Sequence, residues 1–165
     1  MTIKKRYKKS ELIQFTINVL KKVGLNKLNS TTVAELIIRA DERGVWSHGI
    51  VRLPVYVKRI EKRSAKINPS LKFKKITNNI SHLSGDNGLG YIAASAGINK
   101  CVSLAKKNGI GLVAINGSNH FGMAANYLEV AAKNKCRQAG ARAHRRAVRV
   151  RAHRRARRAR ARRVQ

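Results

Sequence analysis

Two short stretches of the sequence hold side chains that could transfer a proton and bind an acid. In RGVWSHGIVRLP, His48 directly follows Ser47, and Arg52 lies four residues further on. The planar guanidinium of Arg52 offers paired N–H donors that suit a carboxylate. In NGSNHFG, His120 lies between two glycines that allow tight backbone paths. A neutral imidazole can accept the proton of a hydroxyl group, which is what the oxidation of an alcohol requires.

Each of these residues, taken alone, also has a purely structural interpretation. A histidine beside a helix end is most often a capping or solvent-facing group, and a single arginine is most often a surface charge. We give His82, which falls in an expected strand, only that structural role. The functional hypothesis for His48, Arg52 and His120 therefore depends on their occurrence together.

The first 44 residues predict two amphipathic helices. Apolar residues recur at helical spacing after Ser10, which we expect to cap a helix that begins at Glu11 and stops before Gly24. A second apolar stripe follows a T-x-x-E capping box at Thr32 and stops before Gly44.

The segment around His48 is expected to break. On one continuous helix, His48 and Arg52 would share a face as residues i and i+4. Pro54 lacks a backbone donor and is better placed in the first turn of a new helix over 54–62. Such a break near Arg52 is typical of segments that present side chains to a cleft.

The rest of the chain, up to the arginine-rich end, alternates strands with helices and predicts an α/β architecture. His120 would lie between a strand end and a helix, where sites form in open α/β sheets. The stretch GDNGLG does not match the G-x-G-x-x-G dinucleotide fingerprint, and we expect a turn there. The expected elements are strands near 71–76 and 80–83, a helix over 91–108, a strand over 110–115 buried on both faces, and a helix over 123–135.

Three segments together resemble the malate/L-lactate dehydrogenase family that lacks a Rossmann domain. They are ADERGVWSHGIVRLPVYVKRI, NGSNHFGMAANYLEVAA and the linking SGDNGLGYIAAS…AKKNGIGLVAI, and the likeness covers roughly residues 7 to 135. The resemblance implies oxidation of a 2-hydroxy acid, or reduction of the matching 2-oxo acid, with NAD or NADP as cofactor. It also implies a homodimer. We expect no metal site, because the two cysteines form no CxxC pair and no metal-ligand cluster.

The resemblance assigns roles to individual residues. His120 matches the family's acid/base, and His48 stays a second candidate because members differ in the histidine credited with proton transfer. Ser47, His48 and Arg52 match residues that line the substrate site. Tyr56 matches a tyrosine near the substrate in some members.

Positive charge dominates the composition and is unevenly placed. The chain has 37 lysines and arginines against 7 acids, a formal net charge of +30. From Arg137 onward there are thirteen arginines, no lysine and no acid, whereas lysine is the main cation before that point. Two cysteines in no metal-ligand pattern, and no apolar run long enough to span a membrane, favour a cytoplasmic protein.

The arginine-rich end has three interpretations. It could be an extension that binds nucleic acid or another polyanion non-specifically. An amphipathic membrane helix is disfavoured because RAHRRA repeats after nine residues, which places the two copies on opposite helix faces. A reading-frame change or sequence join would explain the sudden shift toward residues with G/C-rich codons, and we favour it.

These observations divide the chain into three parts. We expect an N-terminal helical segment with the substrate motif over 1–68, a partial mixed α/β domain over 69–136, and an arginine- and alanine-rich tail over 137–165 outside the fold, disordered or an isolated helix. The resulting hypothesis is a truncated 2-hydroxy acid dehydrogenase that lacks the main cofactor-binding segments and is inactive as written. The alternative is a basic polyanion-binding protein that acts through the tail.

Overall fold

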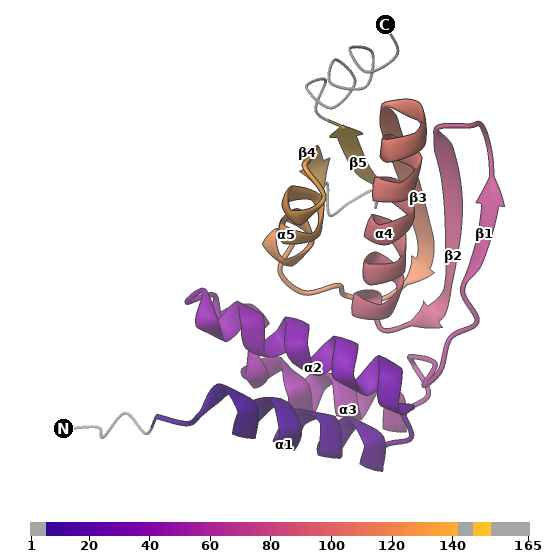
Figure 1. Ribbon diagram of the computed structural model, residues 1–165. Coiled ribbons are helices and arrows are strands. Elements are labelled where there is room, and N and C mark those ends of the chain that lie inside the picture. The colour runs from indigo at the N-terminus through magenta and orange to yellow at the C-terminus, as the bar shows by residue number, and fades with distance from the viewer. Residues whose placement is uncertain (1–5, 142–146, 153–165) are drawn as a thin grey trace, which may run out of the picture.

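Three helices form one end of the molecule in the computed structural model, which describes residues 6–141 and 147–152 (Figure 1). The first two helices pack against each other, and the second also contacts helices of the α/β part. Two single 3-10 turns lie between the second and third helices. The helical part consists of α1 (Lys9–Lys22), α2 (Lys27–Glu42), η1 (Trp46–His48), η2 (Ile50–Arg52) and α3 (Leu53–Glu61).

The starts of these helices differ from those expected. The first begins at Lys9, so Ser10 lies inside it and is not its cap. Asn26 caps α2, and its side chain accepts a hydrogen bond from the Asn29 N–H at 2.8 Å. Thr32 consequently lies within the helix and donates to the Leu28 carbonyl, so the capping box expected there is wrong. An asparagine cap is at least as favourable as threonine, and it starts the helix six residues earlier.

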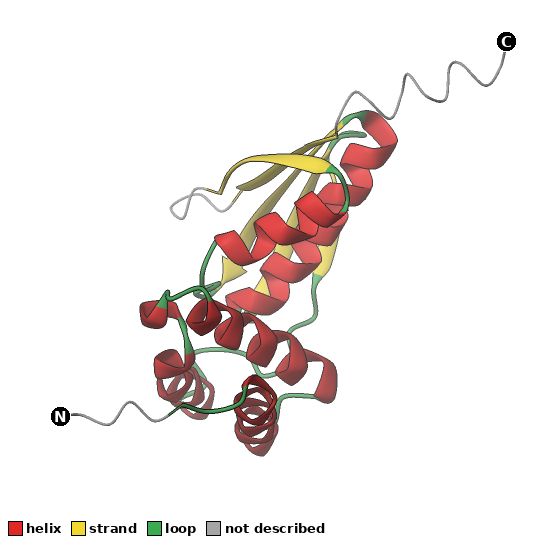
Figure 2. Ribbon diagram, turned by 60° about the vertical axis from the view of Figure 1, so that its left-hand side comes forward, coloured by secondary structure: helices red, strands yellow, loops and turns green. Residues whose placement is uncertain are grey.

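A five-stranded mixed sheet in the order β1-β2-β3-β5-β4 forms the other part. The pairing of β1 with β2 is antiparallel, whereas β2 and β3 are parallel and α4 connects them. Figure 2 shows α4 and α5 together on one side of the sheet. The elements are β1 (Lys72–Lys75), β2 (Ile80–Gly88), α4 (Gly90–Asn108), β3 (Ile110–Ser118), α5 (Ala125–Lys133), β4 (Cys136–Ala141) and β5 (Ala147–Ala152).

Burial along β3 corrects one expectation. Its side chains alternate between buried and partly buried positions, rather than being buried on both faces. Val113 and Ile115 are buried on the face that α4 covers, whereas Leu112 on the other face is only partly buried. Because successive side chains of a strand point to opposite faces and a helix covers only one face, every second side chain of β3 is buried.

Part of the arginine-rich end belongs to the sheet, which corrects the expectation of a disordered tail or isolated helix for those residues. Ala147–Ala152 pairs antiparallel with β3, with Val148 opposite Val113, and also pairs with Cys136–Ala141. Valines alternate in AVRVRA, and β3 offers an edge whose backbone groups need partners. Residues 142–146 and 153–165, where most of the polyanion-binding hypothesis falls, lie outside the described residues.

The core is continuous between the two parts. Leu20 and Ile37 from the helices and Leu83, Ile98 and Val113 from the α/β part belong to one apolar cluster, and each is at most 1% exposed. Within the described residues, no helix is long and apolar enough to cross a bilayer.

Candidate active site

The turn between α2 and α3 positions the first group of predicted residues. The carboxylate of Asp41, near the end of α2, accepts a hydrogen bond from the Ile50 N–H at 2.7 Å. It also packs so closely on Gly49 that any side chain there would overlap it. Burial raises the pKa of Asp41, and the bond from Ile50 opposes that rise. Asp41 thus fixes the path of the turn that holds Ser47 and His48.

Helix α3 then presents Tyr56. It lies four residues after Arg52, which directly precedes α3, and three residues before Arg59, which lies on the same helical face as Tyr56. Tyr56 is only 2% exposed, whereas Arg59 is exposed. Pro54 lies in the first turn of α3, as expected, and the segment before it breaks into two 3-10 turns.

The loop after β3 holds His120 rigidly. The Gly90 N–H donates to the His120 carbonyl at 3.1 Å, and a side chain at Gly90 would overlap the backbone of Asn119 and His120. The amide of Asn119 donates to the carbonyls of Asn87 and Gly88 at 2.9 and 3.2 Å. The loop around the imidazole is therefore tied to the end of β2 and to the start of α4.

These segments bring the predicted residues together. The Tyr56 hydroxyl lies 2.9 Å from His120 Nδ1, and the ring centroids of His48 and His120 are 5.4 Å apart. Ser47 Oγ is 2.9 Å from His48 Nδ1, and Arg52 Nε donates to the Ser47 carbonyl at 2.8 Å. All five predicted site residues thus form one cluster, to which we refer as the histidine cluster. His82 lies apart in the sheet, on β2 opposite Lys74 of β1.

Tyr91 is a member of this network that the sequence did not predict. It is fully buried in the first turn of α4, and its hydroxyl lies 3.0 Å from that of Tyr56. Burial, followed by the neighbouring Tyr56, raises the pKa of Tyr91, which keeps its hydroxyl protonated. The signal in the sequence is a tyrosine in the first turn of an expected apolar helix, because a buried tyrosine hydroxyl needs a hydrogen-bond partner.

The electrostatic surroundings favour a neutral His120. Burial is the largest cause that lowers its pKa, followed by His48, Arg52 and Arg59. The protein engages Nδ1, through the Tyr56 hydroxyl and the Gly122 N–H at 3.3 Å, which leaves Nε2 for a ligand. Because a hydroxyl can donate or accept, Tyr56 can pair with Nδ1 in either neutral tautomer and in the imidazolium, whereas the Gly122 N–H can donate to Nδ1 only while the ring proton is on Nε2. Proton uptake at Nε2 therefore requires the tautomer with the proton on Nδ1, in which the Tyr56 hydroxyl accepts and the Gly122 N–H does not donate to the ring.

The glycine-rich stretch 85–90 is not an open cradle for a dinucleotide phosphate. In the glycine-rich stretch 85–90, a side chain at Gly85 would meet Ser118, and one at Gly88 would meet Pro69. The carboxylate of Asp86 binds Lys66 Nζ at 2.6 Å in the same turn. These glycines serve close packing of protein on protein, and the turn presents an acid. Among residues 6–141 and 147–152, no three histidines, cysteines or acids lie close enough to hold a metal ion.

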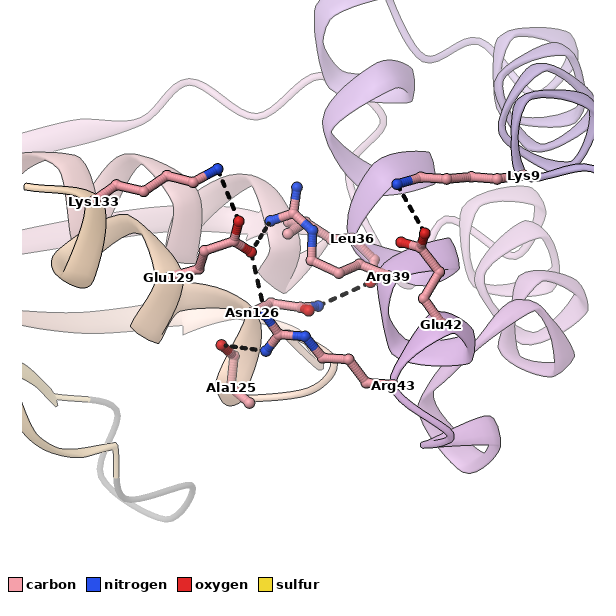
Figure 3. A network of polar contacts seen from close by, with 9 residues as sticks. All are labelled: Lys9, Leu36, Arg39, Glu42, Arg43, Ala125, Asn126, Glu129 and Lys133. Atoms are coloured by element: carbon pink, nitrogen blue, oxygen red, sulfur yellow. Dashed lines mark hydrogen bonds and ion pairs between the residues drawn. The ribbon is translucent and has the colours of Figure 1, made fainter.

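The helical part and the α/β part contact each other in two places. The first is the histidine cluster, and the second, to which we refer as the second joint, holds α2 against α5 (Figure 3). The carboxylate of Glu129 pairs with Arg39 at 3.3 Å, Arg43 at 3.2 Å and Lys133 at 2.8 Å. The buried amide of Asn126 donates to the Leu36 carbonyl at 2.8 Å. The two joints together fix how the helical part meets the α/β part.

Comparisons with known proteins show the family and the fold. The family model described as malate/L-lactate dehydrogenase matches residues 7–154, which extends beyond the end of the likeness expected from the sequence. Malate/(S)-sulfolactate dehydrogenase of Methanothermus fervidus is 35% identical over 118 residues, which are 72% of this chain and 35% of that protein. Malate dehydrogenase of Pyrococcus abyssi is 36% identical over 128 residues, 78% of this chain and 35% of its own length.

Solved structures show the same relationship. Malate dehydrogenase of Pyrococcus horikoshii matches with a TM-score of 0.78 and 32% identity, over 80% of this chain and 38% of its own. Sulfolactate dehydrogenase of Methanocaldococcus jannaschii matches with a TM-score of 0.76 and 31% identity, over 78% and 38%. The chain thus spans about a third of the length of the curated relatives it matches.

Proposed function

Because the chain belongs to the malate/L-lactate dehydrogenase family, we propose that it forms the substrate-binding and proton-transfer part of an NAD- or NADP-dependent 2-hydroxy acid dehydrogenase. The observation that supports this most directly is the convergence of His120, Tyr56 and His48 beside Arg52. The relatives' names, malate, sulfolactate and ureidoglycolate dehydrogenase, all describe enzymes that act on hydroxy acids.

In this proposal Arg52 binds the carboxylate next to the reacting carbon. Its Nε is held by the Ser47 carbonyl, so the two terminal nitrogens remain for a bidentate contact. Ser47 and His48 bond the oxygens around that carbon. Lysine could not replace Arg52, because a single ammonium does not reproduce the two-pronged geometry.

His120 is the proposed acid/base. In the oxidation of a 2-hydroxy acid, Nε2 accepts the hydroxyl proton as the C2–H bond breaks and the carbonyl forms. The imidazolium then retains its Nδ1–H bond to Tyr56, and in the reverse reaction Nε2 returns the proton to the new alkoxide oxygen. The nicotinamide cofactor supplies the hydride acceptor, and no described residue of this chain is assigned to hold it.

We further propose that residues 1–165 alone do not sustain turnover. The glycine-rich stretch is filled by protein contacts, and the positioning of both reactants accounts for a large part of enzymatic rate acceleration. A cytoplasmic homodimer is part of the same proposal. Exposed Trp46 and Val51 beside the histidine cluster support an interface with another chain at this edge.

Two assays test the proposed function. In the first, purified residues 1–165 are mixed with a panel of 2-hydroxy acids and NAD or NADP, and the absorbance of the reduced cofactor is followed. We expect no steady turnover. Turnover that is lost in His120→Ala would contradict the proposal that this chain is only part of the enzyme.

In the second assay, residues 7–135 replace the matching segment of Pyrococcus horikoshii malate dehydrogenase. Loss of a positioned acid/base in His120→Ala should lower the turnover number about 10²–10⁴-fold. Arg52→Lys should mainly raise KM. An unchanged turnover number in His120→Ala, with a large loss in His48→Ala, would transfer the acid/base role to His48.

A further inference from the structure

The loop that carries His120 is attached to α3 through two consecutive residues. Nδ1 of His120 lies 2.9 Å from the Tyr56 hydroxyl, and Oδ1 of Asn119, one residue earlier, accepts a hydrogen bond from Arg59 Nη1 at 3.1 Å. Tyr56 and Arg59 lie three residues apart on one face of the helix. One hydrogen bond alone would leave the imidazole free to swing about that contact, and the second bond restricts this motion.

The side chain of Asn119 is bonded on its other side to the end of β2. Its amide donates to the carbonyls of Asn87 and Gly88 at 2.9 and 3.2 Å, and to Asn87 Oδ1 at 3.1 Å. Because a guanidinium only donates and a carbonyl only accepts, Arg59 and the two carbonyls together allow one orientation of the amide. The amide of Asn119 therefore connects the helical part with the α/β part in a defined geometry.

These contacts close into a ring that includes the end of α3. The amide of Asn87 donates to the Ser64 carbonyl at 3.3 Å, and the Ser64 hydroxyl donates to the Arg59 carbonyl at 3.0 Å. Hydrogen bonds that form such a network can stabilise one another more than isolated bonds do. The ring passes through Asn119, which immediately precedes His120, so it restrains the backbone from which the imidazole projects.

Resting on the proposed function, we propose that Asn119 is a positioning residue for His120, and that it holds the imidazole in place for proton transfer by binding Arg59 on one side and the end of β2 on the other. Arg59 then acts through Asn119. A displacement of about 1 Å can lower a rate about 100-fold. Arg52, the proposed substrate ligand, is anchored separately on the Ser47 carbonyl, so the bonds of Asn119 should affect turnover more than substrate binding.

The first test is steady-state kinetics of the chimera in which residues 7–135 replace the matching segment of Pyrococcus horikoshii malate dehydrogenase. Asn119→Ala should lower kcat about 10–100-fold and change KM much less. Arg59→Met removes the guanidinium from an exposed side chain and should lower kcat to a smaller extent, because the bonds of Asn119 to β2 remain. Arg59→Met added to Asn119→Ala should cause no further loss, because the two residues act as one unit.

The second test does not depend on turnover. The ring C–H signals of His120 are followed by NMR in residues 1–165 over a range of pH. Burial is the largest cause that lowers the pKa of His120, followed by His48, Arg52 and Arg59. Asn119→Ala leaves all of these charged groups in the chain, so we expect the pKa to rise toward its ordinary value as the imidazole becomes less buried.

Asn134→Ala is the matched control. Asn134 is half-buried like Asn119, and its side chain also accepts from a cation, Lys106, and donates to a carbonyl, that of Val130 at 2.9 Å. These bonds lie within the α/β part, at the end of α5. We expect the control to keep kcat and the pKa of His120 near those of the unsubstituted chain. Equal changes in Asn134→Ala would attribute the effect to a general loss of stability and overturn the positioning role.

The remaining outcomes separate the two proposals. If His120→Ala does not lower the turnover of the chimera, the proposed function fails and the positioning role fails with it. If His120→Ala lowers turnover but Asn119→Ala and Arg59→Met do not, the positioning role is wrong while the proposed function stands. A further loss of turnover when Arg59→Met is added to Asn119→Ala would show that Arg59 acts independently of Asn119, and would overturn the proposed connection.

Discussion

The helical part and the α/β part contribute different chemistry to the histidine cluster. The helices provide cations and hydrogen-bonding groups on short turns, and Ser47 and Arg59 there are exposed. The α/β part provides His120, on a loop whose backbone is bonded to the start of α4, and fully buried Tyr91. In the proposed function, substrate binding and proton transfer are thus divided between the two parts, and the contacts between those parts set the geometry of the site.

The largest expected loss of stability comes from disturbing the loop of His120 in the α/β part. In Gly90→Ala the new methyl group would overlap the backbone of Asn119 and His120, so the loop must shift. We expect the free energy of unfolding to fall by about 3 kcal/mol, measured by urea denaturation.

Gly44→Ala is its control. Its φ of +71° is strained for alanine, but open space surrounds it, so the loss should be only about 1 kcal/mol. Equal losses in the two variants would show that the loop of His120 is not tightly held.

The bond between the two parts at the site should have the next largest effect. Tyr56→Phe removes the hydroxyl that contacts both His120 and Tyr91, and it leaves the buried Tyr91 hydroxyl without that partner. We expect a loss of about 1–2 kcal/mol in unfolding free energy. Tyr7→Phe, at a tyrosine that is 59% exposed, should change the unfolding free energy little. An equal loss in Tyr7→Phe would show that the contacts of the Tyr56 hydroxyl do not stabilise the fold.

The pH dependence of stability should report the surroundings of His120. Burial and nearby cations hold its pKa in the folded chain below the ordinary 6.5, so the unfolded chain binds this proton at higher pH. Between the two values the unfolded state holds more protons, and the free energy of unfolding should decrease as pH falls below about 6.5. Denaturation at a series of pH values should show this slope, and His120→Gln should flatten it; an unaltered slope would assign it to other groups.

The second joint should show the smallest effect. Glu129→Gln weakens three surface ion pairs, and such pairs contribute little because water and salt screen them. We expect a slight loss of stability that disappears in high salt. Glu61→Gln, at an exposed residue of α3 that is in no ion pair of the described residues, serves as control. A loss in Glu129→Gln that persists in high salt and exceeds the loss in Tyr56→Phe would mean that the second joint stabilises the chain more than the histidine cluster does.

Local patterns were enough to predict most elements and the residues that converge. The helix that ends before Gly109 and the break before Pro54 depend on neighbours in sequence. The grouping of His48 and Arg52 with His120 was instead predicted from two separated motifs and the family resemblance. Tyr56 was placed near them by family resemblance, and its hydroxyl does contact His120.

Features that depend on distant partners were not predictable. Asn26 and Thr32 both suit a helix start, but the Asn68 side chain accepts from the Asn26 N–H and the Asn29 amide, more than 35 residues away, and stabilises the earlier start. Tyr91 gains its hydroxyl partner, Tyr56, only through the fold. The strand over 147–152 likewise depends on the edge of β3, which composition alone does not reveal.

The contacts between the two parts also bear on the order of events during synthesis and folding. Tyr56 and His120 are 64 residues apart in sequence, and Leu36 and Asn126 are 90 apart. Contacts of such long range form slowly, because a large loop must close before they contribute. A nascent chain therefore exposes the apolar faces of its first helices until β3 and α5 have been made, and during that interval it should depend on chaperones more than its size suggests.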